Sequence, residues 1–185
     1  MLERQPASGL SLRGRTVPAF IAIEGPIGVG KTTLARKIAE TFEYDLLLEE
    51  AEMNPFLERF YQNREQTALA TQLFFLFQRV QKITDIKQRD MFERTRVTDF
   101  ILEKDPLFAR VNLEPAEYAL YDKVYEKMHV EAPTPDLVIY LQANPERLLE
   151  RIGKRGIDAE QSITRSYLEQ LNEVYSEFFL YYDAA

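Results

Sequence analysis

The sequence predicts an α/β fold in which a parallel β-sheet is flanked by helices. Short apolar runs rich in β-branched residues, which are typical of buried parallel strands, alternate with longer segments whose apolar residues recur every three or four positions. The chain has 185 residues and 45% of them are hydrophobic, so it is long and apolar enough for one domain with a buried core.

The beginning of the chain predicts a tail, a strand, a helix and a second strand. Residues 1–17 are polar, and we expect a flexible N-terminal tail there, so that the folded domain comprises 18–185. Residues 19–23 are an apolar run that ends beside a glycine, as a buried strand does. Residues 32–42 predict a helix because apolar side chains recur at every fourth position, and residues 44–48 predict the next strand.

The longest predicted helix covers residues 67–92, where apolar residues recur at steps of three and four. Phe74 and Phe75 widen its apolar stripe beyond what one core face needs, so we expect a second packing partner, a helix of another copy in a homodimer. The remaining predicted elements are a helical stretch opened by Asn54-Pro55, a weak strand at 96–99, a helix at 115–130, a buried strand at 136–141, a helix at 145–152 that ends at Gly153, and a last helix at 163–179.

The composition argues against several kinds of site and partner. Without Cys there is no disulfide, thiolate nucleophile or Cys-based metal site, and a single His does not make a His-based metal cage. The 23 Lys and Arg against 30 Asp and Glu give a net charge of −7, which argues against a basic face that binds nucleic acid. No apolar run approaches the roughly 20 residues of a membrane span. We therefore expect a cytoplasmic protein that has neither nucleic acid nor a membrane as partner.

A phosphate-binding loop follows the first predicted strand. Residues 25–32 read GPIGVGKT and match G-x-x-x-x-G-K-[ST], with a helix predicted directly after them. In this motif the glycines let backbone N–H groups surround phosphate oxygens, the lysine reaches the β- and γ-phosphates, and the last hydroxyl binds Mg²⁺. The motif predicts the P-loop NTPase fold and a nucleoside triphosphate as ligand. The residues expected to bind ATP are Gly25, Gly28, Val29, Gly30, Lys31, Thr32 and Thr33.

Three further segments narrow this prediction to one family. They are the acidic segment at 49–57 with its Asn-Pro pair, the Tyr61, Gln72 and Arg79 series on and before the long helix, and the basic segment at 151–156. Together with the phosphate loop they resemble the deoxynucleoside kinase family, which includes the bacterial deoxyadenosine and deoxyguanosine kinases. The resemblance covers about residues 20–182 and implies transfer of phosphate from ATP, with Mg²⁺, to the 5′-hydroxyl of a deoxynucleoside.

The resemblance also implies the residue that accepts the proton of the hydroxyl. Aligned through Asn54-Pro55, the family's catalytic acid at the end of the second strand maps to Glu49, and Glu50 is the second choice if the register is off by one. The chemistry agrees, because an alcohol that attacks a γ-phosphate needs a proton acceptor within hydrogen-bond reach.

Other family roles map onto single residues of this chain. Gln72 and Arg79 match residues that hold the base, while Tyr61 and Glu160 match residues that contact the 3′-hydroxyl of the sugar. For a second acid that recognises the base, the best match is Asp105. Lys104 competes for this position if the segment is shifted by one residue.

A helical lid is expected at about 151–160. Within it, Arg151 and Arg155 match arginines that close over the phosphates, where charge spreads over the phosphoryl oxygens in the transition state. Many relatives have one more arginine where this chain has Ile157. The lid therefore implies a weaker phosphate clamp, or help from Lys154.

The end of the third strand departs from the family as well. Many members have an acid-Arg-Ser sequence where this chain reads Asp99-Phe100-Ile101. Asp99 is still expected to act with Thr32 on the Mg²⁺ side, but the arginine that contacts the catalytic acid and the phosphate is missing. Arg94 and Arg96 are the candidate substitutes. Relatives also usually continue past Ala185 with an adenine-contacting loop, so the resemblance implies either a longer chain or a more loosely held donor base.

The acceptor is less well defined than the reaction. The Asn54-Pro55-Phe56-Leu57 form of the acidic segment favours a purine deoxynucleoside, although thymidine and deoxycytidine stay open. A nucleoside-monophosphate kinase of the thymidylate type is the first alternative, but Glu49 and Glu50 would repel the phosphate of its acceptor. A nucleotide-dependent switch or ATPase is the second alternative, and it would not need Gln72 and Arg79 to hold a base.

Overall fold

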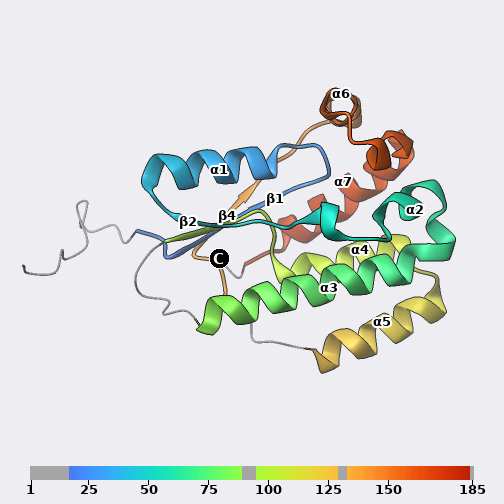
Figure 1. Cartoon of the computed structure of the whole chain (residues 1–185), viewed down its shortest axis with the longest axis horizontal. Coiled ribbons are helices and arrows are strands. Elements are labelled where there is room, and N and C mark those ends of the chain that lie inside the picture. The colour runs from blue at the N-terminus through green and yellow to red at the C-terminus, as the bar shows by residue number, and fades with distance from the viewer. Residues whose placement is uncertain (1–16, 89–94, 129–132, 184–185) are drawn as a thin grey trace, which may run out of the picture.

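Four parallel strands form the centre of the fold in the order β2-β3-β1-β4 (Figure 1). They are β1 (Phe20–Glu24), β2 (Asp45–Leu47), β3 (Arg96–Thr98) and β4 (Leu137–Tyr140). The structure is a computed structural model that describes residues 17–88, 95–128 and 133–183. It confirms the predicted parallel sheet, while the tail predicted at 1–17 lies outside the described residues except for Val17.

Because the strands are parallel and in register, their carboxyl ends lie together at one end of the sheet, which we call the carboxyl edge. In the centre, β1 pairs with β3 on one side, with Ala22 opposite Thr98, and with β4 on the other, with Glu24 opposite Tyr140. In open parallel sheets ligands bind outside this edge. The chain segments that follow β1, β2 and β3 carry the phosphate loop, Glu49 and Asp99, so the topology gathers the predicted site residues there.

Helices cover both faces of the sheet (Figure 1). On one face α1 packs against the strands through a small apolar cluster that includes Ile21, Ile23, Ala35 and Val97. On the other face the larger core joins the long helix to the helices around it. The helices are α1 (Lys31–Phe42), α2 (Leu57–Gln62), α3 (Arg64–Gln88), α4 (Asp105–Asn112), α5 (Pro115–Lys127), α6 (Pro145–Arg155) and α7 (Arg165–Leu180), with short 3₁₀ turns η1 (Ala51–Met53), η2 (Leu102–Lys104) and η3 (Asp158–Ser162).

Two helices differ from the sequence prediction. The predicted helix end at Gly153 is wrong, because α6 continues to Arg155 and ends at Gly156, whose left-handed backbone (φ 68°) terminates it. A glycine inside an exposed helix costs only about 1 kcal/mol, so Gly153 does not stop α6. The helix α4 was not predicted, because Pro106 and a short apolar pattern hide it; proline is nevertheless tolerated in a first helical turn.

The remaining predicted elements agree with the structure within a few residues at their ends. The predicted end of the long helix at residue 92 and of the fifth helix at residue 130 lie outside the described residues. None of the helices in the described ranges is long and apolar enough to cross a membrane.

Candidate active site

The phosphate loop is held tightly between the sheet and α6. Gly25 has a φ of 145°, and a Cβ atom there would lie 2.3 Å from the carbonyl oxygen of Leu141. Gly28 has a φ of 81°, and its Cβ would lie 2.9 Å from a side-chain carbon of Ile152. Both positions therefore require glycine for backbone conformation and for space. The loop leads into α1, whose N-terminal N–H groups have no side-chain cap and point toward an anion site.

Beside the loop lies an open hollow that we call the loop cavity. The lining includes every residue predicted to bind ATP except Gly25, which lies at the base of the loop. The lining residues are Gly28, Val29, Gly30, Lys31, Thr32, Thr33, Leu34, Lys37, Leu141, Arg151 and Arg155.

Lys31 spans the loop. Its Nζ donates to the carbonyl oxygens of Gly25 at 2.7 Å and Pro26 at 3.2 Å. Burial, together with repulsion from Lys104, lowers the pKa of Lys31 to about 8 even though nearby carboxylates favour the charged form. Phosphate oxygens in the loop cavity would attract the same ammonium group.

Thr32 and Asp99 place two oxygen ligands side by side. The Oγ1 of Thr32 donates to Oδ2 of Asp99 at 2.5 Å, and Oδ1 of Asp99 accepts a hydrogen bond from the backbone N–H of Glu49 at 2.7 Å. Mg²⁺ is usually bound by one or two carboxylates together with substrate phosphates rather than by a complete protein cage. The hydroxyl of Thr32 and the carboxylate of Asp99 are oxygen ligands of this kind, so the pair fits Mg²⁺ that arrives with phosphates. The described residues contain no group of three His, Cys, Asp or Glu side chains that could hold a metal.

Glu49 and Glu50 follow β2, and of these two side chains that of Glu49 faces the interior. Arg79 donates to Oε1 of Glu49 from Nε at 2.6 Å, while the Nζ of Lys104 lies 3.5 Å from Oε2. The side chain of Glu49 is 16% exposed, whereas that of Glu50 is 57% exposed and pairs with Lys82 at 2.8 Å. Of the two acids considered from the sequence, Glu49 is therefore the one aimed into the site.

The charges around Glu49 keep it ionised. Burial alone would raise its pKa, but the positive charges of Arg79, Lys104 and Lys31 outweigh burial and lower the pKa to about 2. At neutral pH the carboxylate is an acceptor only, so it can receive a hydroxyl hydrogen bond.

Asn54 fixes the acidic segment against α3 through two hydrogen bonds of its side chain. Its Nδ2 donates to the carbonyl oxygen of Thr71 at 3.1 Å, and its Oδ1 accepts from the backbone N–H of Phe56 at 3.0 Å. The Asn-Pro pair quoted from the sequence is thus a turn that anchors the chain between Glu49 and α2.

Arg79 bridges two acids. Its guanidinium group pairs with Asp105 as well as with Glu49, and burial is outweighed by these two carboxylates, so its pKa is raised. Asp105 is fully buried and also accepts from Nε2 of Gln72 at 2.9 Å and from the hydroxyl of Tyr121 at 2.5 Å. The described partners of its carboxylate are thus the side chains of Arg79, Gln72 and Tyr121.

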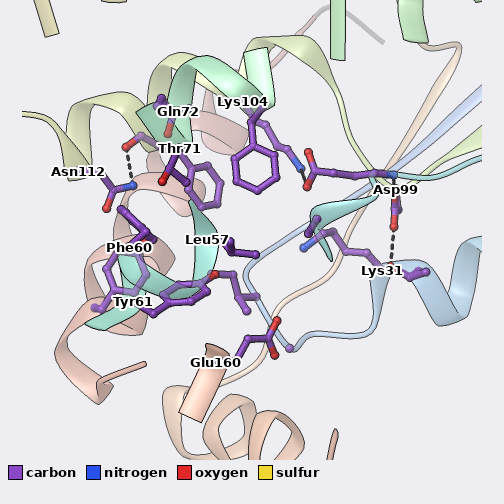
Figure 2. Close-up of a pocket in the computed structure, with 18 of the residues that line it drawn as sticks. Lys31, Leu57, Phe60, Tyr61, Thr71, Gln72, Asp99, Lys104, Asn112 and Glu160 are labelled. Atoms are coloured by element: carbon purple, nitrogen blue, oxygen red, sulfur yellow. Dashed lines mark hydrogen bonds and ion pairs between the residues drawn. The ribbon is translucent and has the colours of Figure 1, made fainter. Parts of the chain in front are cut away.

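A second hollow, which we call the central cavity, lies between α2, α3, α4 and the loop (Figure 2). Gln72 and Lys104 are on one wall, and Tyr61 and Glu160 are opposite (Figure 2). Arg79 also lines it, whereas Asp105 lies behind that wall. The lining residues are Ile27, Gly28, Lys31, Thr32, Glu49, Ala51, Leu57, Phe60, Tyr61, Thr71, Gln72, Phe75, Arg79, Asp99, Lys104, Phe108, Asn112, Arg155, Glu160 and Tyr167.

Several residues of this cavity were not identified from the sequence. Thr71 and Phe75 share a face of α3 with Gln72 and Arg79, so helical spacing could have found them. Phe108 and Asn112 lie on α4, which was not predicted, and no sequence signal pointed to them. The buried Oγ1 of Thr71 and Oδ1 of Asn112 have no hydrogen-bond partner in the described part of the chain.

The lid residues lie at the junction of the two cavities. Arg151 donates from NH1 to the carbonyl oxygen of Val29 at 2.7 Å, and Arg155 forms an ion pair with Glu160. Arg155 lines both cavities, and Glu160 lines the central one. Ile157, which stands where relatives have a further arginine, is 43% exposed.

The structure also shows what surrounds the position of the missing family arginine. Phe100 is buried in the core, so it does not face the cavities as a cation would. Arg94 lies outside the described residues. Arg96 is the first residue of β3 and lies opposite Phe20 in the sheet register, at the other end of the strand from Asp99. The cation found beside Glu49 in addition to Arg79 is Lys104.

The chain is similar in sequence and in structure to known deoxynucleoside kinases. A family model described as deoxynucleoside kinase matches residues 21–185. A deoxyguanosine kinase of Bacillus subtilis is 38% identical over 153 residues, which are 82% of this chain and 74% of that protein. A deoxyadenosine/deoxycytidine kinase of the same organism is 31% identical over 90% of this chain and 79% of its own length. A solved structure of deoxyadenosine kinase from M. mycoides with bound dATP superposes with a TM-score of 0.78 at 30% identity, covering 88% of this chain and 84% of that one.

We predict that an ATP analogue binds more weakly as the pH rises through about 8. Phosphate attracts the protonated form of Lys31, and that form is lost in the free protein above its lowered pKa. By linkage the Kd rises about tenfold between neutral pH and one unit above this pKa. Calorimetric titration at several pH values measures the change. The control variant Lys31→Met should bind the analogue weakly, and its Kd should depend little on pH. A wild-type Kd that stays constant up to about pH 9.5 contradicts the role of protonated Lys31 in phosphate binding.

Proposed function

Because the chain belongs to the deoxynucleoside kinase family, it is an enzyme that phosphorylates deoxynucleosides, and we propose that ATP is the donor, the 5′-hydroxyl the acceptor and a purine the favoured base. The observation that carries this proposal is the junction of the two cavities. Lys31, Thr32 and Arg155 line both of them, and Glu49 lies on the wall of the central cavity. A phosphate donor and a nucleoside bound in the two cavities would therefore meet beside one carboxylate.

The proposed reaction is an in-line transfer. The 5′-oxygen of the nucleoside forms a bond to the γ-phosphorus, the bond from phosphorus to the β–γ bridging oxygen breaks, and ADP leaves. The hydroxyl proton passes to Glu49. Its Oε1 is occupied by Arg79 at 2.6 Å, so Oε2 is the oxygen that receives the proton. With a pKa of about 2 Glu49 is a weak base, which suits a loose transition state where the proton leaves late.

Cations around the junction offset the charge of the phosphates. Lys31 crosses the loop, and Arg151 and Arg155 approach the loop cavity from α6. Thr32 and Asp99 would hold the Mg²⁺ that accompanies ATP, and the ion would supply further positive charge against the phosphates. The Arg155–Glu160 ion pair connects this region to the wall where the sugar would lie.

The base and the sugar are assigned to the central cavity. Gln72 uses its Nε2 to bond Asp105, which leaves its carbonyl oxygen for the base. The unpartnered Oγ1 of Thr71 and Oδ1 of Asn112 support a polar ligand here, since buried polar atoms are normally hydrogen-bonded. Tyr61 and Glu160 on the opposite wall would contact the 3′-hydroxyl. The purine preference is supported by the B. subtilis relative named for deoxyguanosine, whereas the other B. subtilis relative is named for both deoxyadenosine and deoxycytidine.

We also propose a homodimer in the cytoplasm, where ATP is supplied. Helices α3 and α5 lie side by side on the outer side of the molecule (Figure 1). Each of them exposes a large apolar side chain, Phe77 on α3 and Leu120 on α5, and both are 51% exposed. Exposed apolar side chains of this kind are typical of surfaces that another protein covers.

The proposed reaction is tested by incubating the purified protein with MgATP and each of deoxyadenosine, deoxyguanosine, deoxycytidine and thymidine, and with the matching monophosphates. We expect ADP release with nucleosides, fastest with a purine. Fastest release with a pyrimidine overturns the purine preference alone. Release with monophosphates only contradicts the proposed acceptor, and ADP release without any acceptor points to an ATPase.

A matched pair of variants tests the role of Glu49. Glu49→Gln should lower kcat by a factor of roughly 10²–10⁴, because the hydroxyl loses its proton acceptor. Glu50→Gln, one residue further along the chain, should change kcat by less than about threefold because its side chain faces solvent. Steady-state kinetics with saturating ATP measures both. A severe loss in the Glu50 variant together with an active Glu49 variant would move the role to Glu50.

A further inference from the structure

Lys104 is a buried cation to which the proposed function assigns no role. It is the last residue of η2, directly before α4, and only 2% of its side chain is exposed. Its Nζ lies 3.3 Å from Oε1 of Glu24 and 3.5 Å from Oε2 of Glu49. The side chain also lines the central cavity (Figure 2).

We propose that Lys104 is a positioning residue for Glu49, which it orients so that Oε2 faces the acceptor hydroxyl. This proposal rests on the proposed function, in which Glu49 receives the hydroxyl proton. It adds a second cation to the machinery around Glu49, on the carboxylate oxygen that Arg79 does not bind.

The two oxygens of Glu49 have different partners. Arg79 reaches Oε1 at 2.5 and 2.6 Å through NH2 and Nε, so both guanidinium contacts fall on that one oxygen. A carboxylate with contacts at one oxygen is less restricted in the torsion about its last side-chain bond than one held at both oxygens, because such terminal torsions are broad. A cation beside the other oxygen restricts this rotation. At 3.5 Å the contact of Lys104 is long enough to leave Oε2 able to accept a hydrogen bond from a substrate.

Lys104 is in turn held by Glu24. The Oε1 of Glu24 also accepts from the backbone N–H of Ile101 at 2.8 Å, and Oε2 accepts from the N–H of Gly25 at 3.1 Å and the hydroxyl of Tyr175 at 3.2 Å. Glu24 is fully buried at the end of β1, so it is a fixed anchor. The ammonium group of Lys104 is therefore placed by the sheet itself.

Stability alone does not explain a lysine at this place. Taking an ammonium group out of water is costly, and replacing buried ion pairs by apolar side chains is often neutral or stabilising. Lys82 can be compared with Lys104, because it also contacts the chain just after β2. Its Nζ contacts the carbonyl oxygen of Leu48 and the carboxylate of Glu50. Lys82 is 14% exposed and does not line the central cavity. Lys104 differs in facing the reacting groups.

The test is a double-mutant cycle between Lys104→Met and Glu49→Gln. We expect Lys104→Met to lower kcat about 10²-fold, the scale of a misplaced catalytic group, while the Kd of the deoxynucleoside changes less than about threefold. If Lys104 acts through Glu49, the double variant has the kcat of Glu49→Gln alone. Losses that multiply in the double variant, or a Lys104→Met enzyme that keeps its kcat and only binds nucleoside more weakly, overturn the proposal.

Controls separate positioning from folding and from the proposed function. Lys82→Met should keep kcat within about threefold, and thermal melts should show that each variant is folded. If Lys104→Met does not fold, Lys104→Gln takes its place in the cycle. Crystal structures of the wild type and of the folded Lys104 variant should show Oε2 of Glu49 turned away from the cavity only in the variant. This readout holds even if no deoxynucleoside is phosphorylated, and an unchanged Glu49 refutes the positioning role.

Discussion

A buried series of alternating charges, Glu24–Lys104–Glu49–Arg79–Asp105, runs along the edge of the sheet where the strands end. It joins β1, the segment after β2, α3 and the adjoining η2 and α4, which are four separate regions of the sequence. Each internal member has an opposite charge on both sides, so the cost of burial is offset only while the series is complete. Removal of one partner from a buried ion pair typically costs about 3–5 kcal/mol, because it leaves the other charge unpaired. The conformation of Glu49 is therefore tied to the fold.

This series also divides the site into regions with different tasks. We assign the phosphates and their cation to the region formed by the phosphate loop, Thr32 and Asp99. We assign the base to the part of the central cavity formed by Gln72 and the apolar side chains of α3 and α4. Glu49 lies between them, and its Oε2 has only the long 3.5 Å contact with Lys104 among the described residues. A donor and an acceptor can thus be bound by separate elements and still react at a single place. Arg155 and Glu160, which pair across this boundary, would let the occupancy of one region affect the other.

The sequence was most informative where local backbone geometry and function coincide. The glycines of residues 25–30, the following lysine and the strand before them predicted both the fold and the phosphate site, because only this arrangement fits a loop wrapped around phosphate. The sequence favoured Glu49 and kept Glu50 as the second choice, since a shift of one residue at the end of a short strand turns a side chain to the opposite face. The structure separates them through Asp99, which fixes the backbone of Glu49, and through Lys82, which holds Glu50 outward.

Long-range ion pairs were beyond what the sequence could predict. Arg79 was predicted to hold the base, but its two acid partners come from segments 30 residues before it and 26 residues after it. Asp105 was considered as a group that recognises the base, and Lys104 as its competitor. The start of α4, a helix that the sequence did not predict, places Asp105 behind the cavity wall, whereas Lys104 directly before it lines the cavity. The sequence showed that Phe100 stands where an arginine was expected. It did not show that Lys104 lies beside Glu49, because this contact depends on the packing of η2 against the end of β1.

In the proposed reaction Glu49, held at Oε1 by Arg79, presents Oε2 to the acceptor hydroxyl. A crystal structure of the protein with a purine deoxynucleoside and a non-hydrolysable ATP analogue tests this role most directly. We expect the 5′-oxygen within about 3 Å of Oε2 of Glu49 and in line with the γ-phosphate. A complex in which the 5′-oxygen lies beside Glu50, or in which the nucleoside occupies a place outside the central cavity, would contradict it.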